Sequence, residues 1–432
     1  MRGLRGWATA IGVALVIVAA ALVLRHRAGD RWAIGITDPS MVAIRNMVVA
    51  GHLSQATAKL NTTYRFDNPS GLIALREFSL IVLQRGLKEH DLFERCYAAS
   101  ALAAGGEEQG LQMLTDTFQN NPDLSVKMAV ADGLGEVGDK KAVAILSYLY
   151  YHGEPFDRRI IVNGLSSATD PSALSVLSNA MQQHDPQLRL AALKGLGQIG
   201  NPKAIPVLKK AVATSSNAFE RVIAGRSLLM LGDNSGVGAI RSVLTDHSAG
   251  NARAPAAIAL GFTGDRSVVP VLRTALTDED IDVRIGAAAG LTHFGDPGGI
   301  AYLKGAMNDA DRITREHVGQ VLEDVAFVGG HEVVMAALVS PDPNLSMSAV
   351  RAIGLHGGER EVPLLNGLLQ RTNDAVARAD LAWALGRIAS HDGISVLIEM
   401  VREEEPAVRY TAADALDRTA KRLLGGGPVG GV

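Results

Sequence analysis

A chain of 432 residues normally suggests two or three compact domains, and the composition narrows what they could be. One cysteine excludes an internal disulfide framework and any cysteine-based metal site, and aromatic residues make up only 4% of the chain. The formal net charge of −3 does not supply the basic surface of a general nucleic-acid binder, so no nucleic-acid partner is expected.

The first 31 residues contain an uncharged apolar stretch, Trp7–Leu24, with arginines on both sides. At about 1.5 Å per residue a helix of this length spans roughly 27 Å, enough to cross a bilayer. A cleavable signal peptide is the alternative, but its apolar core is usually shorter and ends at small residues before polar sequence. We therefore expect residues 1–31 to be an uncleaved, single-pass membrane anchor. Basic groups are balanced across it, so they assign no side of the membrane.

Residues 32–90 are predicted to form a degenerate helical cap at the start of a repeat array. Apolar residues at helical spacing occur in 41–50, 53–60 and 72–87. An end unit has no neighbour on one side and must differ in sequence from the internal units. At the other end of the chain, residues 425–432 are rich in glycine and are predicted to be a flexible tail.

The stretch 185–212 shows the unit that the array from 91 to 424 repeats: two short helices joined by a tight turn. Asp185 is placed to cap the first helix, and Gly200 can adopt the left-handed conformation that ends it. Leu196 and Leu208 lie in the apolar stripes of the two helices. Helices this short cannot bury their apolar faces alone, so each unit needs a neighbour.

Ten further copies align on the residue that opens the first helix, which we call the anchor. Successive anchors are 31 or 32 residues apart, and the position seven residues later is leucine or isoleucine in every copy. A period of this length built from helical hairpins indicates a solenoid, in which each unit packs on the next. The anchors are Arg95, Lys127, Arg158, Arg189, Arg221, Arg253, Arg284, Arg315, Ser346, Arg378 and Arg409.

The unit has the pattern D-x-x-x-R-x-x-A-x-x-x-L-G-x-x-G-D followed by A-x-x-x-L, with Asn201 in place of the last Asp. It resembles the short HEAT-like repeats named after the phycobilisome lyases. The resemblance covers about residues 91–424 and implies an all-α fold, a right-handed α-solenoid of about eleven two-helix repeats. Together with the anchor, the predicted architecture is this HEAT-like superhelix preceded by an N-terminal transmembrane helix.

The resemblance also implies a ladder between neighbouring repeats, in which the Asp after the turn glycine pairs with an anchor arginine. Copies near 326–390 depart from the pattern, so the ladder is expected to break there. The aspartates that would take part are Asp139, Asp170, Asp233, Asp265 and Asp296.

Most arrays of this kind are binding scaffolds, so we expect a membrane-anchored, non-catalytic scaffold that binds a protein partner along its concave face. A HEAT-type enzyme is one alternative, either a chromophore lyase or a metal-dependent hydroxylase. A structural repeat protein without a dedicated ligand is another. The hydroxylases of this fold hold two irons with repeated His-Glu pairs, whereas this chain has one, His331-Glu332. No catalytic, cofactor-binding or metal-binding residues are therefore predicted.

Two groups of residues are candidates for binding a partner. Twenty residues past the anchor, four consecutive second helices carry a cation: Lys209, Arg241, Arg273 and Lys304. In HEAT-like arrays the second helices line the concave face, so these cations would form a row that holds an acidic or extended segment. Ordinary exposed lysines and arginines are the alternative. The second group is Tyr148 and Tyr151, one turn apart near the end of a second helix, which could be binding anchors or could pack on the next unit.

Three other features have structural interpretations. The acidic run 278–282 lacks the glycine and distal glutamate of an EF-hand and coincides with a helix N-cap, which we favour over a calcium site. Cys96 is expected to be a small packed residue rather than a nucleophile. Trp383 replaces a small residue in a first helix and is expected to lie in the core.

Overall fold

The computed structural model describes residues 38–326 and 329–425, and every regular element in these ranges is a helix. The predicted anchor Trp7–Leu24 lies outside the described residues, as does nearly all of the glycine-rich tail. None of the described helices combines the length and apolar character needed to span a membrane.

In the described part of the chain, three helices precede the repeats: α2 (Pro39–Val49), α3 (Leu53–Thr63) and α4 (Pro69–Gly86). The first helices of the repeats are α5 (Leu92–Gly105), α7 (Leu124–Val137), α9 (Arg158–Leu165), α11 (Pro186–Gln198), α13 (Ala218–Met230), α15 (Arg253–Gly261), α17 (Ile281–Thr292), α19 (Arg312–Ala326), α21 (Pro343–His356), α23 (Ala375–Ile388) and α25 (Pro406–Leu423). The second helices are α6 (Glu108–Asn120), α8 (Lys140–His152), α10 (Leu174–Ala180), α12 (Ile205–Thr214), α14 (Val237–Thr245), α16 (Val269–Ala275), α18 (Pro297–Ala306), α20 (His331–Leu338), α22 (Val362–Leu369) and α24 (His391–Met400).

The local signals of the repeat act as the sequence predicts. Asp185 caps α11, because its Oδ1 accepts the backbone N–H of Gln187 at 2.9 Å. Gly200 has φ +62°, the left-handed conformation that ends the first helix. Leu196 and Leu208 are fully buried between neighbouring helices. The acidic run at 278–282 is also a cap, since Asp280 accepts the N–H of Asp282 at 2.9 Å.

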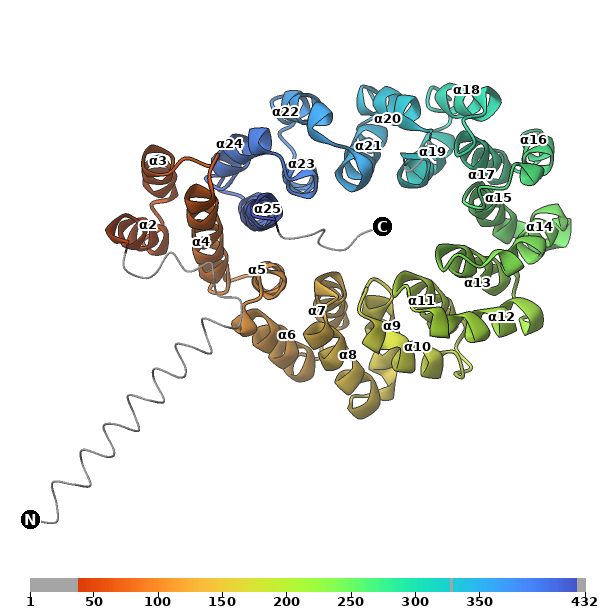
Figure 1. The fold of residues 1–432 in the computed structure, drawn as a ribbon, viewed down its shortest axis with the longest axis horizontal. Coiled ribbons are helices and arrows are strands. Elements are labelled where there is room, and N and C mark those ends of the chain that lie inside the picture. Colours follow the sequence, from red (N-terminus) through yellow and green to blue (C-terminus); the bar gives the residue numbers. More distant parts are fainter. Residues whose placement is uncertain (1–37, 327–328, 426–432) are drawn as a thin grey trace, which may run out of the picture.

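The repeats are arranged in two layers, with the first helices on the inside of a curve and the second helices on the outside (Figure 1). The prediction that second helices line the concave face is therefore wrong. Small residues explain the direction of the curve, because first helices touch through their backbones. A Cβ placed on Gly261 would lie 2.8 Å from Cα of Gly290, and one on Gly135 would lie 2.1 Å from the carbonyl oxygen of Gly164. Closer packing on the inside bends the array toward that layer.

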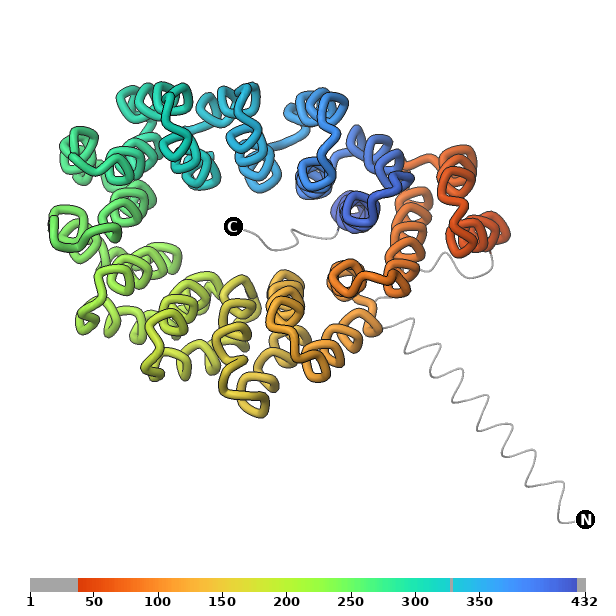
Figure 2. The backbone as a smooth tube through the Cα atoms, turned by 180° about the vertical axis from the view of Figure 1, so that it is seen from behind, coloured from red at the N-terminus to blue at the C-terminus, as the bar shows by residue number. Residues whose placement is uncertain are grey.

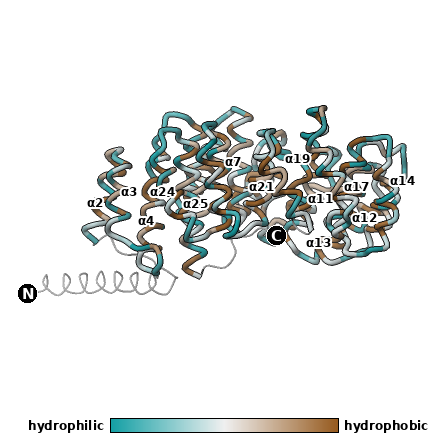
Figure 3. The backbone as a smooth tube through the Cα atoms, turned by 90° about the horizontal axis from the view of Figure 1, so that it is seen from above, coloured by the Kyte–Doolittle hydropathy of each residue, from teal (hydrophilic) through white to brown (hydrophobic). Residues whose placement is uncertain are grey.

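The bend continues until the two ends of the array meet, so the repeats form a closed ring rather than an open superhelix (Figures 1 and 2). Helix α25 packs against both α4 and α5. It is the first helix of the eleventh repeat, and α4 lies outside it in the place of a second helix (Figure 1). The predicted N-terminal cap thus has neighbours on both sides, and one apolar core runs from α2–α5 into α17–α25. A side view shows hydrophilic segments concentrated at the turns along the two rims (Figure 3).

Candidate functional site: the interior of the ring at its closure

The anchor arginines join neighbouring repeats, but through partners other than the predicted ones. Arg189 donates to the carbonyl oxygens of Gln183 and His184, both at 3.0 Å, in the turn before its own helix. Its guanidinium also pairs with Glu220 of the next repeat at 2.7 Å. Arg315 and Arg378 make equivalent pairs, with Asp342 at 2.7 Å and Glu403 at 2.5 Å.

The turn aspartates do not pair with the anchors as the resemblance implied, because each caps the helical segment that follows it. Asp139, for example, accepts the N–H of Ala142 at 2.8 Å at the start of α8. Ser346, the one anchor without a charge, donates its hydroxyl to the carbonyl oxygen of Leu338 at 3.1 Å. This bond reaches back to the preceding helix α20, so the forward ion pair to the next repeat is missing at Ser346, within the segment where a break was expected.

The four candidate cations lie on helices of the outer layer, α12, α14, α16 and α18, and each contacts the next repeat (Figure 1). Lys209 pairs with Asp233 at 2.8 Å, and Arg273 pairs with Asp296 at 2.7 Å. Arg241 donates to the Ser267 hydroxyl at 3.3 Å, and Lys304 pairs with Glu332 at 3.2 Å. The row exists, but it lies on helices of the outer layer and links repeats. Glu332 of the single His-Glu pair is engaged in this row.

Tyr148 and Tyr151 are about half exposed at the end of α8, in the outer layer. The Tyr148 ring stacks on His152, with ring centroids 4.5 Å apart. Their neighbour Tyr150 is the one that packs inward, where its hydroxyl donates to Asn179 of the next repeat at 2.9 Å. These two tyrosines are therefore available to a partner only on the outside of the ring.

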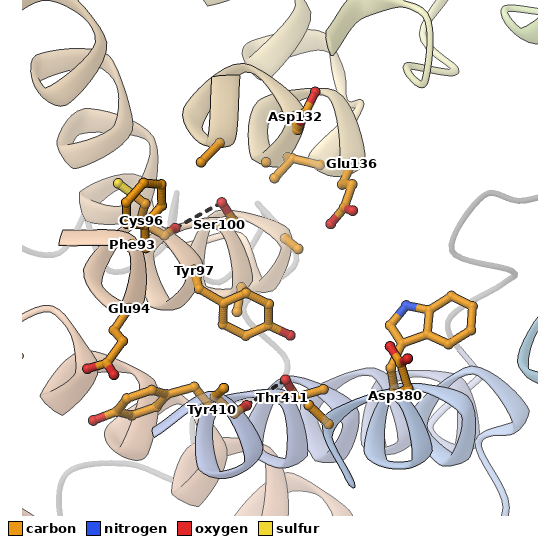
Figure 4. A pocket seen from close by; sticks show the side chains of 18 of the residues that line it. Phe93, Glu94, Cys96, Tyr97, Ser100, Asp132, Glu136, Asp380, Tyr410 and Thr411 are labelled. Carbon is orange, nitrogen blue, oxygen red and sulfur yellow. Dashed lines mark hydrogen bonds between the residues drawn. The ribbon is translucent and has the colours of Figure 1, made fainter. Parts of the chain in front are cut away.

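A hollow lies on the inner surface where the ring closes. This closure cavity has a volume of about 730 Å³, and its walls come from both ends of the chain (Figure 4). One wall is formed by α5 and α7, and the other by α19, α21, α23 and α25. Residues that are hundreds of positions apart in sequence therefore face one another across it.

Aromatic side chains line this cavity. Tyr97 extends from α5 toward α25, and it keeps over a third of its surface exposed (Figure 4). Removal of its hydroxyl from water raises the pKa of Tyr97, so the phenol stays protonated. Trp383 is half-buried beside the cavity rather than in the core as expected, and it lies 5.8 Å from the guanidinium of Arg387. Burial raises the pKa of the Cys96 thiol to about 11, so it is unreactive as the sequence predicts.

The charges of the cavity wall are predominantly negative. Five carboxylates and two guanidiniums line it, a net charge of three negative. The guanidiniums are occupied, because Arg351 pairs with Asp380 at 3.4 Å and Arg418 pairs with Asp414 at 2.8 Å. In the described parts of the chain no residue forms a hydrogen bond or ion pair with the carboxylates of Asp132 and Glu136 on α7.

Both α7 carboxylates reach solvent inside the ring, yet surrounding protein removes part of their hydration. This loss of hydration raises the pKa of Asp132. It also raises the pKa of Glu136, where Arg418 opposes the shift and the nearby carboxylates of Asp414 and Asp132 add to it. The pair is thus accessible and crowded, and none of the described residues forms an ion pair with it.

Farther around the ring, a second contact crosses the inner surface. Arg226 of α13 pairs with Asp324 of α19 at 2.7 Å, although the two residues are 98 positions apart. The Arg226 guanidinium lies 4.7 Å from the Phe262 ring centroid, and that ring is 4.2 Å from His293. Burial lowers the pKa of His293 to about 4, so this imidazole is neutral in the fold. Within residues 38–326 and 329–425, no three or more His, Cys, Asp or Glu side chains are arranged to hold a metal.

Sequence reasoning missed the closure cavity because it assigned the inner face to the wrong helices. Nine positions past the anchor, four of the first helices carry a charged residue: Glu136, Asp324, Arg387 and Arg418. The alignment of the repeats already contains these charged positions. It does not predict the contact between α5 and α25, because no feature of either helix indicates that the other is its neighbour.

Comparison with known proteins agrees with this architecture. A family model for HEAT repeats matches residues 144–228, 238–323 and 307–386. No curated protein sequence matches the chain. Among solved structures, human deoxyhypusine hydroxylase in complex with glycerol is 21% identical, with a TM-score of 0.28, over 57% of this chain and 96% of that one.

Two further structures are similar at the same level. The complex of CpcE and CpcF of phycocyanin lyase from Nostoc sp. PCC7120 is 21% identical, with a TM-score of 0.34, over 58% of this chain and 94% of that one. Kap121p bound to Ste12p is 12% identical, with a TM-score of 0.32, over 86% of this chain and 50% of that one. The matched segments, 144–228 and 238–386, make up more than half of the sequence, and the chain belongs to the family of HEAT-repeat proteins.

Proposed function

We propose that this protein is a non-catalytic scaffold that binds a protein partner on the inner surface of its ring. The observation that carries the proposal is the closure cavity, where exposed aromatic side chains and unpaired carboxylates face the interior. Partly exposed aromatic residues such as Tyr97 and Trp383 are typical anchors of protein interfaces. The proposal assigns no catalytic or cofactor-binding residue.

The proposal includes a membrane tether, which rests on the sequence of Trp7–Leu24 alone. Fractionation of the producing cells tests it. The full chain should stay with the membranes after alkaline carbonate extraction, and a chain lacking residues 1–31 should be released. Release of the full chain by carbonate would contradict the membrane tether. It would not bear on the proposed binding surface.

The binding surface is tested with a photo-activated cross-linker, p-benzoylphenylalanine, placed at one position at a time. Tyr97 reports on the inner surface, and Tyr148 reports on the outer one. We expect a protein to be cross-linked from position 97 in isolated membranes, and Trp383→Ala to reduce its yield. Cross-links only from position 148 would move the binding surface to the outside of the ring.

The outer cations remain a second proposed surface for an acidic partner. Arg241 is the member best suited to it, because among the described residues its guanidinium bonds only to the hydroxyl of Ser267, at 3.3 Å. Arg241→Glu combined with Arg273→Glu should weaken capture of such a partner. Unchanged capture by a folded double variant would exclude this surface.

A further inference from the structure

We infer that the closure cavity and the groove beside it take an extended segment of a partner protein that presents a lysine or arginine next to apolar residues. The inference rests on the proposed function and specifies the chemistry of the partner. Three observations support it: the unpaired carboxylates, the exposed apolar rim, and the continuity between two hollows.

The first observation is the charge on α7. Asp132 and Glu136 are four residues apart, so their carboxylates lie on one face of the helix. Like charges at this spacing destabilise a helix, and partial loss of hydration adds to the cost. A cation bound between them would remove both penalties. The arginines of the cavity cannot do so fully, since Arg351 and Arg418 already pair with other carboxylates.

The second observation is a set of exposed apolar residues near the amino-terminal ends of the inner helices around the closure. Helices α23, α5 and α7 and the turn that precedes α9 contribute to it. Isolated exposed apolar residues are ordinary, but here two of the residues line the closure cavity and three line the hollow beside it, as at an interaction site. The members are Phe93, Leu124, Met128, Phe156 and Val376, with exposed fractions of 47%, 40%, 47%, 71% and 68%.

The third observation is that a second hollow adjoins the closure cavity. It has a volume of about 440 Å³ and lies between α7 and α9, where Leu124, Met128 and Phe156 form its apolar walls and Asp132 and Arg159 are its charged residues. Asp132 lines both hollows, so they meet at an unpaired carboxylate. An extended segment lying across α5, α7 and α9 would place apolar side chains in the two hollows and a cationic one at Asp132 and Glu136.

The charge also argues against other occupants. In the closure cavity an acidic peptide or a nucleic acid would meet a net charge of three negative and two guanidiniums that are already paired. The adjoining hollow adds a single cation, Arg159, which shares its wall with Asp132. Double-stranded and single-stranded nucleic acids both need basic grooves. A segment with a cation flanked by apolar residues complements both features of the surface.

The test uses a random library of 12-residue peptides displayed on phage, selected against the full-length chain in detergent. Selected peptides should carry Lys or Arg beside apolar residues. Fluorescence anisotropy should show at least tenfold weaker binding to Asp132→Asn/Glu136→Gln. The matched control is Asp116→Asn/Glu154→Gln, which removes the same number of carboxylates from exposed positions outside the cavity and should bind as the parent does.

Several results would overturn the inference. Selection of acidic peptides would contradict recognition of a cationic segment. So would peptides that bind Asp132→Asn/Glu136→Gln as tightly as the parent. If such peptides nevertheless failed to bind Trp383→Ala, the inner surface would remain a binding site and only this inference would fail. If no peptide binds and position 97 forms no cross-link to another protein, the proposed function fails with it. Cross-linking from position 97 to residues 1–31 of the same chain, which contain five arginines, would assign the cavity to that segment instead of a partner.

Discussion

Arg76 and Asp417 are 341 residues apart in sequence, yet Nε of Arg76 donates to Oδ1 of Asp417 at 3.0 Å. Asp417 is 1% exposed, and its other oxygen pairs with Lys421 at 2.8 Å. Arg76 also donates to the carbonyl oxygen of Gly105 at 2.8 Å, and Lys421 donates to that of Ala104 at 2.7 Å. One buried carboxylate thus organises the contact among α4, α5 and α25, where the ring closes.

Replacing this carboxylate should open the ring. Asp417→Asn leaves Arg76 and Lys421 without their counter-ion, and losing one partner of a buried ion pair costs about 3 kcal/mol. We expect the free energy of unfolding to fall by that order in urea denaturation. Glu108→Gln, which breaks an exposed pair with Lys141, is the control and should cost less than about 1 kcal/mol. Equal stability of the two variants would show that the closure does not depend on Asp417.

Close packing at the closure gives a second prediction. A Cβ on Gly86 would lie 2.6 Å from Cβ of Ala98 and 2.9 Å from the Tyr410 ring. Gly86→Ala should therefore destabilise the protein by about 1–3 kcal/mol through overpacking. Gly367→Ala, in α22 with nothing within 4 Å of the added atom, should instead stabilise it by about 0.5–1 kcal/mol. Stabilisation by both substitutions would mean that α4 and α25 are not in contact.

Among the outer cations, those that pair with a carboxylate should contribute more to the free energy of unfolding than those that bond to a neutral group. Arg273 is bonded to the carboxylate of Asp296, whereas Arg241 reaches a serine hydroxyl. Arg273→Ala should lower the free energy of unfolding by about 1 kcal/mol, a small value because the arginine side chain is largely exposed. Arg241→Ala should lower it by only a few tenths of a kcal/mol. Thermal denaturation of the two variants measures the difference. A larger loss for Arg241→Ala would contradict the assigned pairs.

His293 gives a prediction about pH. The pKa of His293 is about 4 in the fold, below its ordinary value of 6.5, with Asp324 opposing and Arg226 reinforcing the effect of burial. Below pH 6.5 the unfolded chain therefore binds a proton that the folded one does not, and stability falls as pH drops from about 6.5 to 4. The slope from this group approaches about 1.4 kcal/mol per pH unit.

His293→Leu should flatten the pH dependence of unfolding in that window, as measured by urea denaturation at several pH values. His184→Gln, at an exposed position before α11, controls for the loss of a histidine. A profile as steep in His293→Leu as in the parent would show that another group causes the loss of stability in acid.

The sequence was sufficient for the unit and its stacking. Leu196 and Leu208 belong to columns that stay apolar in copy after copy, and Asp185 and Gly200 are local signals whose effect does not depend on distant residues. These features follow from helix periodicity and capping, which a single repeat already contains.

The curvature and the closure could not be obtained in the same way. The inward bend depends on backbone contacts such as Gly261 with Gly290, and small residues in a helix do not indicate which neighbour they will touch. The pairing of Arg76 with Asp417 joins a segment outside the repeat pattern to the last repeat. The cation row is a periodic feature of the sequence, but it was assigned to the concave face because the second helices were expected there rather than in the outer layer.

The central claim is that α25 returns to α5 and closes the ring around the cavity. It is tested most directly with p-benzoylphenylalanine at position 97 of the purified chain, followed by mass spectrometry of the cross-linked peptides. Because Tyr97 extends toward α25, we predict an intramolecular cross-link to the peptide that contains Thr411. Cross-links confined to the neighbouring α6 and α7, or formed only between molecules, would contradict the closed ring.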